Sequence, residues 1–446
     1  MMDYIGLASD LVRKCRAKGA DEAEVYIEIG RELRIEIRNG DVETVQESSS
    51  HGLGVRVFNN GRLGFAHCND LSEKALDHTL SQAVKFSANA TADENNVLPD
   101  SSDSSDTLLL FDPGLREIPM TEKISLAKKT ESSALKTARI TKSAGAGYSE
   151  SESKIFIANS RGMSKSRRSS TCGFGVSVVA EKGEQKSSGS KSCRRRFYAD
   201  LPPSSSIATE AASKASEMLD PRMVKTQRAP VIFHPDVAYS LLGGLLAAVN
   251  GKSVLQGASF LGERLGRKIG SENITIIDDG LRPRGLASTP FDGEGVVARK
   301  STIVEKGILK QYMYNTIAAR RAGKSSTGNA IRAGFTGLPG IGPHNFYMEP
   351  GSMSPDEILR STPRGLLLKN VTGYGINPVN GNFSGGAAGF WIENGRIEFP
   401  VKGLTIAGTA DEMFAGIDML GNDLDENLPF TAPTLRIRSL QIGGEN

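Results

Sequence analysis

The sequence predicts an α+β protein, with N-terminal α/β modules that contain antiparallel sheet and a C-terminal β-rich domain with embedded helices. Two observations support this prediction. In the first half, amphipathic helical segments are followed by alternating strands that turn at Asn-Gly pairs. From about residue 229 the chain becomes rich in glycine and short apolar runs, which favours short strands joined by tight turns.

The N-terminal elements follow from local patterns. Residues 3–18 are expected to form a helix, because apolar residues recur at spacings of three and four. Alternating apolar residues then predict strands that reverse at Asn39-Gly40 and at Asn60-Gly61, both strong hairpin signals. A second amphipathic helix is expected directly after these strands, which gives a meander with one buried face.

The middle of the chain is predicted to repeat this helix-and-strand pattern loosely. Helices are expected at 121–138 and 205–219, and short strands at 154–158 and 173–180. The C-terminal part should begin with a buried strand at 231–233 and a helix at 235–249, followed by short strands. The predicted later strands cover 274–277, 296–304, 308–314, 366–371, 389–393, 397–400 and 403–407.

A chain of 446 residues is too long for one hydrophobic core and suggests several domains. We expect an N-terminal module at 1–90, a polar linker at 91–118, a middle module at 119–225 and a C-terminal domain at 226–446. The linker assignment depends on a run rich in Asn, Asp and Ser.

Two basic clusters stand out in the middle module. Lys165, Arg167 and Arg168 form the first cluster, and residues 194–196 form the second. We expect both to be solvated hairpin tips, and a surface for an anionic partner is the alternative. The net charge of +3 is small for this length, and no nucleic-acid-binding signature is present, so no nucleic-acid partner is expected.

Composition predicts a cytoplasmic protein without a membrane span. No run approaches eighteen apolar residues, and residues 1–4 lack the features of a secretory signal. The four cysteines have no CxxC spacing and form no disulfide framework, which indicates a reducing compartment. They are Cys15, Cys68, Cys172 and Cys193.

The histidines are too sparse to predict a metal pair. His51, His67, His78, His234 and His344 are the only five, and none lies close to another in sequence. We interpret His234 and His344 as hydrogen-bonded structural residues, and a ligand or base role is the alternative.

Two acidic groups lie in the Gly-rich half. Asp278-Asp279 and Asp292/Glu294 have the oxygen chemistry that Mg²⁺ or Ca²⁺ prefers. They also suit two turns in which carboxylates accept hydrogen bonds from free backbone N–H groups, and we favour this turn interpretation.

The segment 377–388 is a candidate peptide-binding site. Its small residues allow close approach of another backbone, so an extended peptide could add to an unpaired strand edge there. Tight packing within the subunit is an equally good explanation. The candidate residues are Asn377, Asn380, Asn382, Gly385, Gly386, Ala387 and Ala388.

Several ordered runs carry a resemblance to a known family. In the first half they are GADEAEV at 19–25 and GLGVRV at 52–57. In the second half they are IIDDG at 276–280, STPFDGEGV at 288–296, EKGIL at 305–309, NPVNGNFS at 377–384, GAAGFWIENG at 386–395, TIAG at 405–408 and GNDL at 421–424. Together they resemble the TldD/PmbA family, and in particular its PmbA branch, also called TldE.

The resemblance implies a two-subunit zinc peptidase that degrades unstructured peptides. In the TldD branch, a helix with an HExxxH motif and a C-terminal cysteine hold the metal. The matching positions here are Ser240, Leu241 and Leu245, and no cysteine follows Cys193. Leu241 and Leu245 belong to an apolar row that predicts core packing.

The resemblance therefore implies a non-catalytic subunit without a cofactor of its own. Its expected partners are a TldD-like catalytic subunit that carries zinc, or a second copy of this chain, and an unfolded peptide. Three alternatives remain open: a stand-alone peptide-binding homodimer, a modulator of a protein target such as DNA gyrase, and a hydrolase that uses no metal. No GxSxG elbow supports the last of these.

Overall fold

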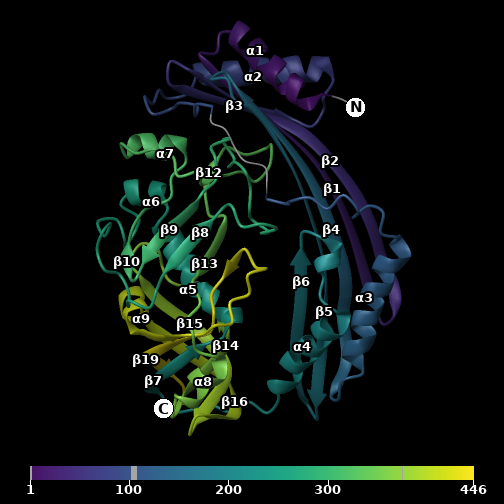
Figure 1. Cartoon of the computed structure of the whole chain (residues 1–446), viewed down its shortest axis with the longest axis vertical. Coiled ribbons are helices and arrows are strands. Elements are labelled where there is room, and N and C mark those ends of the chain that lie inside the picture. The colour runs from purple at the N-terminus through teal and green to yellow at the C-terminus, as the bar shows by residue number, and fades with distance from the viewer. Residues whose placement is uncertain (1–2, 102–107, 374, 446) are drawn as a thin grey trace.

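The computed structural model describes residues 3–101, 108–373 and 375–445. A long curved sheet forms one side of the molecule, and a compact β-rich C-terminal lobe lies against its concave side (Figure 1). The predicted α+β class is confirmed. Residues 102–107 of the predicted linker lie outside the described residues.

The long sheet contains strands from both N-terminal modules. Its order is β3-β2-β1-β4-β5-β6, and each neighbouring pair is antiparallel. The Asn39-Gly40 and Asn60-Gly61 turns have positive φ at both residues, as predicted for tight hairpins. The strands are β1 (Glu22–Arg38), β2 (Asp41–Asn59), β3 (Arg62–Cys68), β4 (Ile140–Asn159), β5 (Ser164–Lys182) and β6 (Gln185–Arg195).

Alternation along the strands separates two faces. In β1, Val25, Ile27, Leu33 and Ile35 are buried in the cores under the N-terminal helices, whereas Tyr26 packs toward the C-terminal lobe. The convex face is therefore covered by helices, and the concave face looks onto the other lobe (Figure 1). The helices are α1 (Tyr4–Ala17), α2 (Glu73–Ala88), α3 (Met120–Leu135) and α4 (Ser204–Glu217), with a short 3-10 helix at Tyr198–Asp200.

The C-terminal lobe is built around a closed sheet. Its order is β16-β15-β14-β7-β19-β17, and an additional pairing of β16 with β19 closes it. The largest hydrophobic core of the described chain fills this lobe and contains Trp391 and Phe233. The strands are β7 (Gln227–Phe233), β14 (Arg364–Thr372), β15 (Asn382–Glu393), β16 (Arg396–Thr409), β17 (Ile417–Leu420) and β19 (Leu435–Gly443).

A second sheet and five helices complete this lobe. The sheet order is β10-β9-β8-β13-β18, from β8 (Ile276–Asp279), β9 (Lys300–Glu305), β10 (Ile308–Leu309), β13 (Asn345–Met348) and β18 (Phe430–Thr431). A small hairpin joins β11 (Ala330–Ile331) to β12 (Gly340–Ile341). The helices are α5 (Pro235–Ala248), α6 (Gly251–Leu255), α7 (Thr316–Arg321), α8 (Pro355–Arg360) and α9 (Ala410–Gly416).

Several strands differ from their predicted lengths. The segments predicted at 154–158 and 173–180 are parts of much longer strands, β4 and β5. The strand predicted at 308–314 is limited to β10. None of the helices in the described parts of the chain is both long and apolar enough to span a lipid bilayer.

Candidate functional site

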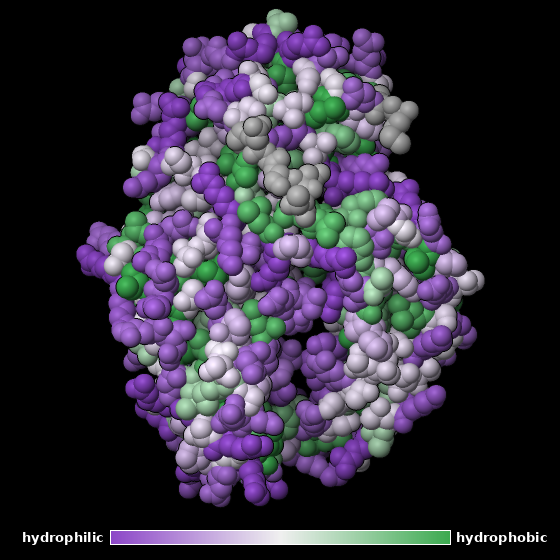
Figure 2. All heavy atoms as spheres, in the orientation of Figure 1, coloured by the Kyte–Doolittle hydropathy of each residue, from purple (hydrophilic) through white to green (hydrophobic). Residues whose placement is uncertain are grey.

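A large cleft lies between the two lobes, where the concave sheet faces the C-terminal lobe. Its volume is about 1700 Å³, and Figure 2 shows a hollow between the lobes that is bordered by hydrophilic residues. Strands β5 and β6 with helix α4 form one wall, and helix α5 with strands β14 and β15 forms the other. Small-molecule pockets occupy about 300–1,000 Å³, so this cleft has room for several residues of an extended chain.

Strand β6 presents a free edge to this cleft. Within the described residues it pairs with β5 alone, and every residue from Gln185 to Arg195 lines the cleft. Four serines and one glycine provide small side chains at five of its eleven positions. Gly189 lies directly against α4, where an added Cβ would come 2.3 Å from the Ala211 carbonyl oxygen. Backbone N–H and C=O groups along this edge are therefore available for pairing with another extended chain.

An ion pair connects the two walls of the cleft. On α4, Lys214 lies 3.3 Å from Glu210 and 2.6 Å from Asp236, which belongs to the first turn of α5. Burial alone would raise the pKa of Asp236, but the hydrogen bond from Lys214 lowers it below its usual range. The Lys214–Asp236 pair thus remains charged and fixes α4 against α5.

His234 caps the N-terminus of α5. Its Nδ1 accepts a hydrogen bond of 3.2 Å from the Asp236 backbone N–H. Burial and the nearby Lys369 lower the pKa of His234 to about 4. The imidazole is therefore neutral near pH 7, and this arrangement agrees with the structural role that we inferred from the sequence.

Helix α5 contains neither histidine nor glutamate. Leu241 and Leu245 have no exposed surface and belong to the C-terminal core, so the predicted core packing is confirmed. Ser240 lines the cleft, and its buried Oγ has no hydrogen-bond partner among the described residues. Only one of the three positions therefore faces the cleft.

The segment expected to offer an unpaired strand edge does not offer one. Strand β15 pairs with β14 on one side and with β16 on the other. Gly386 lies opposite Thr372 and Thr405, and a Cβ added at Gly385 would lie 2.9 Å from the Thr372 carbonyl oxygen. The expectation of strand addition at Gly385, Gly386, Ala387 and Ala388 is wrong, because these small residues serve packing within the closed sheet.

The three asparagines of the same segment form local turns. The Asn377 Oδ1 accepts hydrogen bonds from the N–H groups of Val379 and Asn380, and the Asn380 Oδ1 accepts one from Asn382. Of the seven predicted residues, Ala388 lines the cleft.

The two acidic groups do not converge as metal ligands. Asp278 accepts hydrogen bonds from the His344 backbone and from the Asn329 side chain, and its Oδ2 lies 3.0 Å from the His344 Nδ1. Asp279 accepts a turn hydrogen bond from Leu281. Asp292 accepts three backbone N–H groups, which fits the turn interpretation. Over the described ranges, no group of three His, Cys, Asp or Glu side chains is placed to hold a metal ion.

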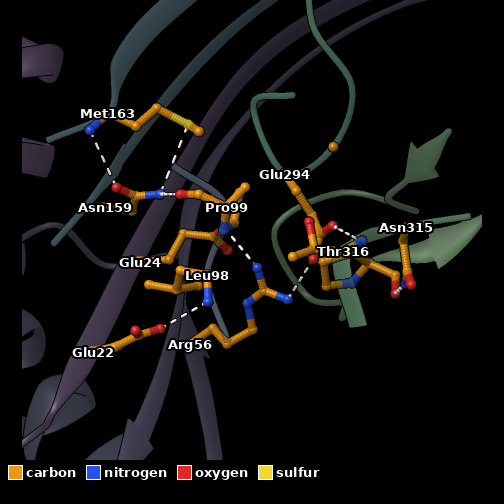
Figure 3. A network of polar contacts seen from close by, with 12 residues as sticks. Glu22, Glu24, Arg56, Leu98, Pro99, Asn159, Met163, Glu294, Asn315 and Thr316 are labelled. Atoms are coloured by element: carbon orange, nitrogen blue, oxygen red, sulfur yellow. Dashed lines mark hydrogen bonds and ion pairs between the residues drawn. The ribbon is translucent and has the colours of Figure 1, made fainter. Parts of the chain in front are cut away.

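Glu294 instead joins the two lobes through a buried charge network (Figure 3). Arg56 donates one hydrogen bond of 2.9 Å to Glu294 and another of 2.8 Å to Glu24, its cross-strand neighbour. The other Glu24 oxygen pairs with Arg332, and the other Glu294 oxygen accepts the Thr316 N–H at 2.8 Å. All four charged side chains are at most 2% exposed. The network contains two cations and two anions, so the cost of burying each charge is offset by a paired opposite charge.

The GLGVRV run of the sequence has a role at the same interface. The ring of Phe335, from the loop between β11 and β12, occupies the space where a side chain at Gly52 would lie. At Gly54, an added Cβ would come 2.3 Å from the Phe335 carbonyl oxygen. The two glycines therefore let this C-terminal loop rest directly on the concave sheet.

The basic clusters are not uniformly solvated hairpin tips, as had been expected. Arg168 stacks on Phe111 and pairs with Glu152, whereas Arg167 and Arg196 line a smaller cavity between the lobes. Arg196 is only 5% exposed. Sequence reasoning missed this burial because the contacts come from distant parts of the chain.

Comparisons with known proteins agree with this architecture. Three family models match: PmbA/TldA metallopeptidase domain 1 at residues 23–87, the central domain at 113–219 and the C-terminal domain at 226–444. Metalloprotease PmbA of Escherichia coli O157:H7 is 32% identical over 431 residues, which cover 96% of this chain and 93% of that protein. The chain therefore belongs to the PmbA/TldD family.

Solved structures share the fold over nearly the whole chain. TldE from Thermococcus kodakarensis has a TM-score of 0.90 and 25% identity, covering 98% of this chain and 99% of that one. A Bacteroides thetaiotaomicron protein, named for a modulator role toward DNA gyrase, has a TM-score of 0.91 and 25% identity, with 99% of both chains covered.

Proposed function

We propose that this chain is the non-catalytic subunit of a TldD/TldE-type metallopeptidase complex in the cytoplasm. In this complex a TldD-like subunit supplies the zinc, and this chain helps to hold an unfolded peptide. The composition of α5 supports the proposal. By its resemblance to the TldD branch, Ser240, Leu241 and Leu245 stand where the HExxxH motif has its two histidines and its glutamate.

The packing of α5 explains why these residues are unsuited to metal chemistry. Zinc sites in proteins use imidazole, thiolate or carboxylate ligands, and serine and leucine offer none of these. Leu241 and Leu245 also contribute to the core, so α5 has a structural role in this subunit. The nearest histidine in sequence, His234, uses its Nδ1 to cap the helix.

The cleft is the proposed peptide site, and β6 is the strand to which the peptide adds. Strand addition relies on main-chain hydrogen bonds, so it tolerates many sequences. The eleven residues of β6 would span about 36 Å in extended form. Ala388 lies on the opposite wall, where it would limit the space beside the bound chain.

Metal and activity measurements test the proposed subunit role. The purified chain is expected to hold no stoichiometric zinc and to cleave no unstructured peptide alone. Together with a TldD-like protein, it should co-purify and support peptide hydrolysis. About one tightly bound zinc per isolated chain, or full hydrolysis by this chain alone, would overturn the proposal. Peptide binding by this chain, combined with failure to co-purify with a TldD-like protein or to support hydrolysis by it, would favour the stand-alone peptide-binding protein.

N-methylated peptides test strand addition at β6. An unstructured decapeptide should bind the intact chain. The same peptide methylated at alternate backbone nitrogens should bind at least about tenfold more weakly, because the hydrogen bonds from its N–H groups to β6 are lost. Methylation in the other register serves as the matched control, because those nitrogens would point away from β6. Equal binding of all three peptides would exclude strand addition.

A further inference from the structure

A second cavity, of about 260 Å³, lies between the lobes beside the large cleft. The sheet contributes Tyr26, Arg167 and Ser169, and Arg196 follows directly after β6. Loops of the C-terminal lobe close the other side, including Asp292. The two cavities are neighbours along the chain, because Arg194 and Arg195 line the cleft while Arg196 lines the smaller cavity.

Arg167 carries a buried charge without a close counter-charge. Its Nε is buried and, within the described residues, has no hydrogen-bond partner. Its guanidinium hydrogen-bonds the Tyr26 side chain, and Glu28 and Asp292 act on its charge through space, but neither carboxylate forms an ion pair with it within the described chain. Burial lowers the pKa of Arg167, yet a guanidinium stays protonated at neutral pH.

Arg196 adds a second positive charge that is held only by neutral groups. Its nitrogens donate to the carbonyl oxygens of Ser170 at 3.2 Å, Gly285 at 3.1 and 3.2 Å, and Leu286 at 2.6 Å. Burial and the charge of Arg167 lower the pKa of Arg196 to about 10. Carbonyl dipoles therefore orient this guanidinium, but no carboxylate of the described chain neutralises it at close range.

The other charged groups that line the cavity already have ion-pair or hydrogen-bond partners. Arg332 pairs with Glu24, and Asp292 uses both oxygens on backbone N–H groups. His344 faces Asp278 at 3.0 Å. Asp292 is thus the one carboxylate among the described residues that line the cavity, and the guanidinium groups of Arg167 and Arg196 outnumber it. Burying a charge without an ion-pair partner costs several kcal/mol.

We propose that this cavity binds a small carboxylate-bearing anion between Arg167 and Arg196. A carboxylate matches the planar fork of an arginine and provides the missing counter-charge. The volume suits a group of a few heavy atoms rather than a large ligand. The carboxylate has two chemical sources: the free C-terminus of a peptide lying in the adjacent cleft, or a free small carboxylate. The first source rests on the proposed peptide function, and the second does not.

Calorimetric titration of the full chain tests the site with three probes. These are the tripeptide Gly-Ser-Gly with a free carboxylate, the same tripeptide with a C-terminal amide, and succinate. The free tripeptide or succinate should bind, and Arg167→Met should weaken that binding at least about tenfold, the usual scale for one charged hydrogen bond. Arg168→Met is the matched control, because Arg168 is paired with Glu152 outside this cavity.

The pattern of binding identifies the source of the carboxylate. Binding of the free tripeptide but not of its amide supports the peptide C-terminus, whereas binding of succinate alone supports a free small carboxylate. Binding of none of the probes, or equal binding by the wild type and Arg167→Met, overturns the proposal. These outcomes do not depend on zinc content or peptide hydrolysis, so they are separate from a failure of the proposed subunit role.

Thermal unfolding without probe distinguishes an anion site from a structural ion pair. Arg167→Met removes a charge that has no carboxylate partner within the described residues, so the melting temperature should stay the same or rise. A large decrease with Arg167→Met, but not with Arg168→Met, would show that Arg167 stabilises the fold through a partner of its own, and would overturn the proposal.

Discussion

Placing the related metal motif in α5 is expected to destabilise the fold rather than create a zinc site. The triple variant Ser240→His, Leu241→Glu, Leu245→His replaces two leucines that have no exposed surface. Each loses about 1.5–3 kcal/mol of apolar burial, and each new polar group that stays unpaired costs about 1–3 kcal/mol more. The expected loss at the two leucines is about 5–12 kcal/mol, which is comparable to the whole stability of a typical domain.

Urea denaturation and elemental analysis of the triple variant provide the measurement. The single variant Ser240→Ala is the control, because it removes a buried hydroxyl that has no partner and should leave stability unchanged or slightly higher. A triple variant that folds normally and binds about one zinc per chain would refute the reasoning, because it would show that these positions face a cavity.

Three further outcomes are expected. Glu294→Gln leaves the buried Arg56 short of one carboxylate and should lower the free energy of unfolding by about 3–5 kcal/mol, and an unchanged denaturation midpoint would contradict a buried network. The pKa of His234 in the folded chain is about 4, below its value in the unfolded chain. The free energy of unfolding should therefore fall as the pH decreases from about 6.5 to 4. The variant His234→Asn keeps a helix cap and should remove about 1–2 kcal/mol of that decrease. Gly54→Ala should displace the loop at Phe335, measured as faster proteolysis there, and unchanged cleavage would count against this contact.

Local patterns predicted the parts of the fold that depend on neighbouring residues. The hairpins at Asn39-Gly40 and Asn60-Gly61 formed as expected, since these residues tolerate positive φ. The apolar row of α5 also predicted its burial, because Leu241 and Leu245 lie on one face of the helix. Both signals act over a few residues, and no distant contact is needed to interpret them.

The long polar strands were missed for a physical reason. Strand β6 and the first half of β4 are rich in Ser, Gly and charged residues. Their concave side faces the cleft, so they lack the strict apolar alternation that marks a half-buried strand. Their pairing is specified instead by β5, whose apolar residues Phe174 and Val178 pack under the helices.

The site itself depends on contacts that the sequence does not encode locally. Small residues such as Gly386 suit a free edge and a crowded closed sheet equally well, and the pairing of β15 with both β14 and β16 decides between them. Arg56 and Glu294 are 238 positions apart, so their pairing required the folded structure.

The lobes are held together at several separate places, and this matters for the proposed peptide site. The Arg56 network lies on one interface, and the Lys214–Asp236 pair crosses the cleft. Breaking a pair of the buried Arg56 network costs several kcal/mol, whereas the partly exposed Lys214–Asp236 pair contributes less. The Arg56 network therefore holds the lobes in place before any peptide arrives. In a preformed cleft, none of the free energy of peptide binding is used to bring the lobes together.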